Sequence, residues 1–235
     1  MEVPAEAVVQ ETTDRLANRP GDDAAHELRA RAMLALGRLD EAERDAAAAV
    51  RLDPDEVRYR ELLAEVLAAR GAHRDAALEF DRLARNDPRQ VAWTLAKANE
   101  WLAAADGAKA VEAARQAIRL DPTNTDAQLV LARGLTRVGD AGAALAAATR
   151  AVEQRPGDAL ALETLADALW LAGRPAEAFA RLAQLALDLA GGDRTRVVAK
   201  ARSVYRHHAG WLGRLVAGLP PIFGWALRRG WLALR

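Results

Sequence analysis

The chain has 235 residues, of which 51% are hydrophobic and 28% are charged, a composition that can bury a core and excludes a chain disordered throughout. It contains no cysteine, which excludes disulfides, thiolate metal sites and thiol catalysis. The net charge of zero hides an asymmetry, because residues 193–235 hold nine basic side chains and one acid, whereas residues 1–192 hold 24 basic and 32 acidic ones.

The first segment, residues 1–22, shows no sign of a targeting leader. Its sequence MEVPAEAVVQETTD has neither a basic region nor an apolar region, so we expect no secretory signal. No stretch of about 20 residues is apolar throughout, so we expect no standard transmembrane helix. These features predict a cytoplasmic protein, with membrane association left open. Residues 5–18, which end before Pro20, match only the second helix of a repeat that would precede the first complete one, and predict an N-terminal half repeat or capping helix.

A 34-residue period runs through residues 23–190. Prolines recur at Pro20, Pro54, Pro88, Pro122 and Pro156. Glycines keep the same spacing at Gly37, Gly71, Gly139 and Gly173, with Ala105 at the remaining position of the series. Two alanine columns follow it as well, Ala30, Ala64, Ala98, Ala132 and Ala166, and Ala42, Ala76, Ala110, Ala144 and Ala178. Repeats of this length indicate stacked supersecondary units.

Each column has a physical reason in a helix–turn–helix unit. The glycine lies where a first helix ends and the chain turns, a position that favours a left-handed residue. The proline follows the second helix and stops it from continuing. The two alanine columns lie on facing helices, where small side chains let the backbones approach closely. We expect about 14 residues in each first helix and about 13 in each second helix.

With these columns the sequence resembles the tetratricopeptide repeat family over residues 23–190, as five repeats. The resemblance implies an all-α, right-handed superhelical solenoid of antiparallel helix pairs, with an N-terminal half repeat and a C-terminal helical tail. The chain departs from the family at the bulky columns, since the aromatic of the second helix survives only as Phe80. The tryptophan expected early in the first helix is replaced by His26, Arg60, Thr94, Gln128 and Leu162.

The resemblance also implies a concave groove lined by the first helices, which would bind a protein or peptide partner. Its candidate residues are Glu27, Arg31, Arg58, Glu61, Glu65, Asn99, Leu102, Asp126, Leu129, Arg133, Arg137, Glu163, Asp167 and Trp170. The set is acidic around Glu61 and Glu65 and basic around Arg133 and Arg137, which favours a partner with both charges, or with a carboxylate near the fourth repeat. Some members of the family grip a C-terminal carboxylate with a lysine and asparagine clamp. That pattern is absent, because no lysine accompanies Asn99. Any single charge is explained as well by a solvated helix face, and only the set favours binding.

No catalytic constellation is visible in the sequence. Ser203 is the only serine, and the adjacent His207 and His208 would point about 100° apart on a helix. No glycine-rich phosphate loop is present. We therefore expect a scaffold or adaptor and not an enzyme, with no cofactor and no metal site.

The basic C-terminal part divides into two segments. Residues 191–210 predict a capping helix whose apolar stripe contains Val197, Ala201, Val204 and Tyr205. Residues 211–235 combine three tryptophans and four arginines with no acid, and Pro220-Pro221 divides them into two pieces too short to span a bilayer. The candidate contact residues there are Trp211, Phe223, Trp225, Leu227, Arg228, Arg229, Trp231 and Leu234.

Three interpretations of residues 211–235 stay open. The segment is suited to the interface of an anionic membrane, to a groove on a partner protein, or to packing on its own acidic repeats. In the last case it would hold the groove autoinhibited until a partner displaced it. We do not expect nucleic acid as a partner, because the acidic repeats would repel phosphates.

Overall fold

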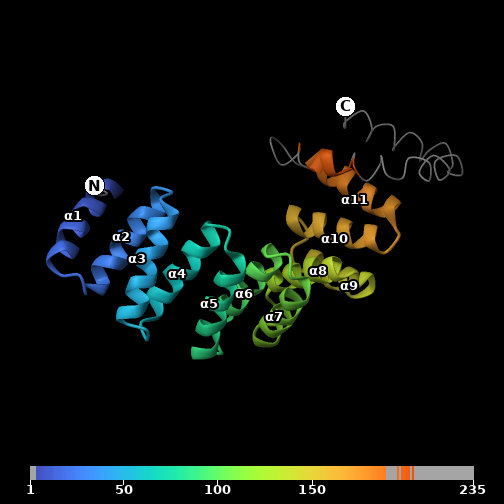
Figure 1. Ribbon diagram of the computed structural model, residues 1–235. Helices are drawn as coiled ribbons and strands as arrows, with labels where there is room; N and C mark the ends of the chain where they lie inside the picture. Colours follow the sequence, from blue (N-terminus) through green and yellow to red (C-terminus); the bar gives the residue numbers. More distant parts are fainter. Residues whose placement is uncertain (1–3, 189–194, 196, 202, 204–235) are drawn as a thin grey trace, which may run out of the picture. The chain divides into compact units, whose positions relative to one another are not determined.

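The structure, a computed structural model, describes residues 4–188, 195, 197–201 and 203, and all regular secondary structure among these residues is helical (Figure 1). The chain divides into two compact units, residues 1–122 and 123–235. The described part of unit 1 contains α1 (Ala5–Asn18), α2 (Asp23–Ala35), α3 (Leu39–Leu52), α4 (Val57–Ala69), α5 (His73–Asn86), α6 (Val91–Ala103) and α7 (Gly107–Leu120). That of unit 2 contains α8 (Thr125–Val138), α9 (Ala141–Gln154), α10 (Ala159–Leu171), α11 (Pro175–Asp188) and further helical residues among 195–203.

Within each unit every helix packs against the next one along the chain. In unit 1 this series runs from α1 to α7, and in unit 2 from α8 to α11, where α8 also packs on α10. The expected all-helical fold of stacked helix pairs is therefore confirmed. The helix lengths lie within one residue of those expected: α2, α4, α6 and α10 have 13 residues, and α3, α5, α7, α8, α9 and α11 have 14. Each first helix begins after an N-cap residue two positions beyond the proline.

The turn between the two helices of each pair uses one left-handed residue, as predicted. Gly37, Gly71, Gly139 and Gly173 have φ angles of +72°, +79°, +86° and +72°. Ala105 occupies the same place in the third pair with φ +64°. Because an L-residue with a Cβ is strained in this region, the third turn is held by its neighbours against a local cost of about 1 kcal/mol.

Replacing Ala105 with glycine is expected to raise the free energy of unfolding by about 0.5 kcal/mol. The relief of left-handed strain, about 1 kcal/mol, exceeds the extra conformational entropy that glycine brings to the unfolded chain. The matched control is Ala104→Gly at the neighbouring C-cap, whose φ is −68°, and which should lose stability instead. Urea unfolding of the two variants measures the difference. Equal effects of the two substitutions would contradict the assignment of strain to Ala105.

The two alanine columns form the contact surfaces between helices. Every member of both columns is buried, with exposed fractions between 0 and 2%. One core cluster in unit 1 shows the arrangement: Ala30 and Met33 of α2 meet Ala42 of α3 together with Leu62 and Val66 of α4. Small side chains from two helices thus leave room for the large side chains of the next pair, which is how close backbone packing and a filled core are achieved together.

The start of α2 depends on Asp22. Its carboxylate accepts a hydrogen bond from the backbone N–H of Ala25 at 3.0 Å and two from the Arg15 guanidinium of α1 at 2.6 and 2.9 Å. The Arg15 hydrogen bond first, and then that from Ala25, lower the pKa of Asp22 below its ordinary value. The same side chain therefore caps one helix and ties it to the preceding one.

The lowered pKa of Asp22 gives unit 1 a specific acid sensitivity. A depressed pKa in the folded state means that the contribution to stability is present above the unfolded pKa and is lost as the pH falls through the folded pKa. We expect Asp22→Asn, which keeps an N-cap acceptor but loses the charge, to show a shallower loss of stability between about pH 5 and pH 2. Urea unfolding across this range measures the slope, and parallel curves for wild type and variant would contradict the prediction.

Candidate functional site

The candidate groove residues lie on the first helices, α2, α4 and α6 in unit 1 and α8 and α10 in unit 2. They divide into three groups by exposure. Glu27, Leu102, Leu129 and Glu163 are buried, and Glu61, Asp167 and Trp170 are half-buried. The exposed members are Arg31, Arg58, Glu65, Asn99, Asp126, Arg133 and Arg137. The candidates in residues 211–235 lie outside the described residues.

Three of the carboxylates link successive helices of the stack. Glu27 of α2 meets the Arg58 guanidinium of α4 at 3.7 Å and that of Arg31 at 2.9 Å. Glu61 of α4 accepts a hydrogen bond from the indole N–H of Trp93 in α6. Glu27 and Glu61 occupy one 34-residue column, which holds Leu95 and Leu129 in the next two repeats, so among these four repeats this position joins two first helices by a polar contact only in the first two.

Glu163 continues this column in unit 2. Its carboxylate lies 3.8 Å from the Lys200 ammonium, which also donates a hydrogen bond of 2.7 Å to Asp167. Val197 and Ala201, on the same helical segment as Lys200, are fully buried. Lys200 therefore contacts a carboxylate of this column on α10, as Arg58 of α4 contacts one on α2. Glu27 and Glu163 are only 7 and 8% exposed, so their main contacts are within the fold.

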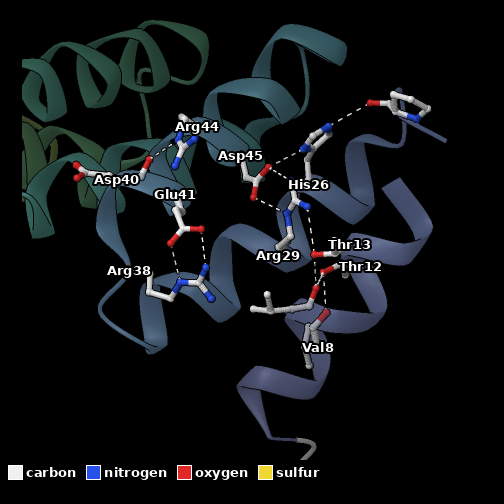
Figure 2. A network of polar contacts seen from close by, with 12 residues as sticks. Val8, Thr12, Thr13, His26, Arg29, Arg38, Asp40, Glu41, Arg44 and Asp45 are labelled. Atoms are coloured by element: carbon white, nitrogen blue, oxygen red, sulfur yellow. Dashed lines mark hydrogen bonds and ion pairs between the residues drawn. The ribbon is translucent and has the colours of Figure 1, made fainter. Parts of the chain in front are cut away.

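In the column where the family has tryptophan, the first two pairs of this chain have polar side chains that form hydrogen bonds. In the first pair His26 lies with Nδ1 2.8 Å from Asp45 Oδ1 and Nε2 3.2 Å from the Pro20 carbonyl (Figure 2). In the second pair Arg60 donates to Glu79 at 2.9 Å and to the Pro54 carbonyl at 3.1 Å. Both residues thus bridge the preceding loop to a carboxylate 19 residues ahead, on the second helix.

Asp45 is the centre of the polar cluster in the first pair. Arg29 of α2 donates two hydrogen bonds of 2.7 Å to its carboxylate, one to Oδ2 and one to Oδ1, the oxygen that His26 also contacts (Figure 2). The hydrogen bond to Asp45 raises the pKa of Arg29 above its ordinary value. Asp45 and Glu79 were not predicted, although a 19-residue spacing of opposite charges in two repeats is a signal that the sequence contains.

The third and fourth pairs lack such a carboxylate. Thr94 and Gln128 stand in the same column and are buried, and the positions 19 residues ahead are alanines, Ala113 and Ala147. Among the described residues, Thr94 Oγ1 and Gln128 Oε1 have no hydrogen-bond partner. The column therefore changes from charged bridges to uncharged side chains along the chain.

Unit 2 contains a further ion pair on its first-helix side. Asp126 in the first turn of α8 accepts two hydrogen bonds from the Arg155 guanidinium at the end of α9, at 2.8 and 3.2 Å. The hydrogen bond to Asp126 raises the pKa of Arg155 above its ordinary value. Arg133 and Arg137, further along α8, have no ion-pair partner among the described residues.

The described residues contain no group of three or more histidine, aspartate or glutamate side chains placed to hold a metal ion. In this part of the chain no helix combines the length and the apolar character needed to cross a membrane.

Comparison with known proteins places these features in a family context. The sequence profile of the tetratricopeptide repeat matches residues 27–91 and 129–194. A tetratricopeptide repeat protein from Parabacteroides merdae has a similar structure, with a TM-score of 0.66, 13% identity, and coverage of 86% of this chain and 93% of that one. PilW, a type IV pilus biogenesis factor, gives a TM-score of 0.64 and 19% identity over 83% of this chain and 90% of that one. YrrB gives a TM-score of 0.55 and 15% identity over 84% of this chain and 94% of that one. No curated protein matches in sequence.

Proposed function

This chain belongs to the tetratricopeptide repeat family, and from this we propose that it is a non-catalytic scaffold that binds a segment of a partner protein across its first helices. The observation that carries the proposal is one column of the repeat: Arg31, Glu65, Asn99, Arg133 and Asp167. The proline column and the two alanine columns repeat the same residue in every pair, whereas this one changes charge from pair to pair. A regular scaffold that presents a varied, largely exposed column is suited to recognising one particular segment.

The fold neighbours are consistent with this proposal. YrrB is described as a tetratricopeptide repeat protein with an unusual peptide-binding site. Stacked helix pairs place equivalent side chains at a regular spacing, so an extended segment can contact several repeats at once, and binding does not require an enclosed cavity. The proposal therefore assigns recognition to the first helices and leaves the second helices as support.

A charge reversal on each kind of helix tests the proposal. Peptides that bind the full chain are first selected from a display library, and their affinity is then measured for Glu65→Lys and Glu112→Lys. Both glutamates are exposed in unit 1, Glu65 on the first helix α4 and Glu112 on the second helix α7. We expect some selected peptides to lose about tenfold or more in affinity with Glu65→Lys and to be unaffected by Glu112→Lys. The reverse pattern, or failure to select any peptide, would contradict the proposal.

A second candidate function is docking at an anionic membrane through residues 211–235. The observation behind it is the sequence, in which Trp211, Trp225 and Trp231 accompany four arginines and no acid. Liposome flotation of the full chain and of a chain ending at residue 210, which retains Lys200, separates the alternatives. Flotation of the full chain alone on anionic vesicles supports docking. If neither floats and the shorter chain binds selected peptides more tightly, the segment instead inhibits the first-helix face.

A further inference from the structure

We propose that α8 binds an acidic segment of the partner through Arg133 and Arg137. The inference rests on the proposed function and specifies the chemistry of the partner at the fourth repeat. Arg133 and Arg137 are four residues apart on a helix, so they lie one turn apart on one face, together with the buried Leu129 that anchors this face to the core. Both guanidinium groups are exposed.

The two arginines repel each other where they stand. Like charges at this spacing destabilise a helix, and within the described residues neither arginine has an ion pair to offset this. A pair of unneutralised cations on a recognition face is instead favourable when an anionic ligand binds between them.

The carboxylates of the same face are already engaged. Asp126 is held by Arg155, and Asp167 by Lys200, which also lies beside Glu163. Asp167 and Glu163 share the single charge of Lys200, and none of the three acids forms an ion pair with Arg133 or Arg137 within the described residues. The charge that this part of unit 2 offers to a ligand is positive, although residues 1–192 are acidic as a whole.

The interaction of a cation with the helix dipole can account for only one of the two arginines. Arg137 lies in the last turn of α8, where a cation interacts favourably with the helix dipole. Arg133 lies one turn earlier, where that effect has faded. Arg133 is thus the residue whose presence calls for a ligand, and its substitution is the more informative one.

The spacing of the arginines defines the ligand further. Four residues of helix separate them by about 6 Å along the axis. In an extended segment, side chains two residues apart lie on the same side and are about 6.7 Å apart. An acid-x-acid sequence in extended conformation therefore places one carboxylate opposite each guanidinium, with room for two charge-assisted contacts.

The test uses random 12-residue peptides displayed against the full chain, followed by affinity measurements on the selected peptides. We expect acid-x-acid sequences to be enriched, and their affinity to fall about tenfold or more for the Arg133→Glu, Arg137→Glu double variant. The control is Arg150→Glu on the second helix α9 of the same unit, an exposed arginine that has no ion-pair partner among the described residues and should change affinity less than twofold. Lysine-containing counterparts of the peptides should bind the double variant better than the wild type.

The outcomes separate this inference from the proposed function. Peptides that are selected without acidic residues, or acidic peptides that bind the double variant as tightly as the wild type, overturn the α8 site and leave the scaffold in place. Equal losses with Arg150→Glu overturn it too, because the effect would be one of net charge. Failure to select any peptide overturns both. Circular dichroism of the variants establishes that their helices are intact.

Discussion

Replacing Leu62 with alanine is expected to destabilise unit 1 by about 3–4 kcal/mol, one of the two largest effects that we predict. Leu62 is 1% exposed and packs in the cluster formed with Ala30, Met33, Ala42 and Val66. Two of these neighbours are alanines that have no longer side chain to move into the space, so most of the cavity would remain open. The lost contacts with the cavity then add to the lost transfer free energy.

The repeat supplies a matched control for this substitution. Leu28 stands at the same position of the preceding repeat, in α2, but is 44% exposed. Leu62 has α2 and α3 beside it, whereas the described chain has only α1 before α2. Leu28→Ala should therefore cost less than about 1 kcal/mol. Hydrogen exchange of the α2 and α4 amides measures both variants without assuming that the two units unfold together. Similar losses in the two variants would show that burial in the stack does not set the cost.

The helix pairs could be predicted because their signals are local and repeated. The glycines at positions 37 and 71 predict a left-handed turn, and Pro54 predicts the end of a helix, without reference to residues far away in the sequence. Even the exception at Ala105 was located by the period alone. The boundary between the two units at residue 122 could not be predicted in this way, because Pro122 keeps the 34-residue spacing and the alanine columns continue across it.

The candidate site was predicted less completely, because side-chain partners depend on the neighbouring repeat. The column position of Glu27 and Glu163 assigned them to first helices, but it did not show that these carboxylates would be buried against Arg58 and Lys200. The position of a residue on its own helix does not show what the next helix brings to it. Arg133 and Arg137 remain exposed because the next first helix, α10, brings them no carboxylate that is not already paired. Their assignment to binding is still a proposal.

Removing the carboxylate of Asp45 is expected to destabilise unit 1 by about 2–3 kcal/mol. Asp45 is 5% exposed, and Asp45→Ala would leave the Arg29 guanidinium and the His26 ring without their anionic partner. Breaking a buried pair in this way costs about 3–5 kcal/mol, and we expect less because the Arg29 and His26 side chains retain some access to water. Hydrogen exchange of the α2 and α3 amides again provides the measurement.

The fourth repeat indicates how the lost stability can be recovered. At the positions of His26, Arg29 and Asp45, it has Gln128, Leu131 and Ala147. Introducing His26→Gln and Arg29→Leu together with Asp45→Ala copies this uncharged set into the first repeat. We expect the triple variant to regain most of the stability lost by Asp45→Ala, because replacing a buried ionic cluster with uncharged residues is often close to neutral.

Recovery should be incomplete, because a glutamine at position 26 would bring the same unsatisfied oxygen that Gln128 has in the fourth repeat. The order of stability, wild type above triple variant above Asp45→Ala, is therefore the expected result. If the triple variant is less stable than the single one, the side chains of His26 and Arg29 stabilise the first repeat by more than their pairing with Asp45, and the two sets of residues are not interchangeable. The order expected here would mean that the family's aromatic column has been replaced twice in one chain, by ion pairs and by uncharged side chains, on the same backbone.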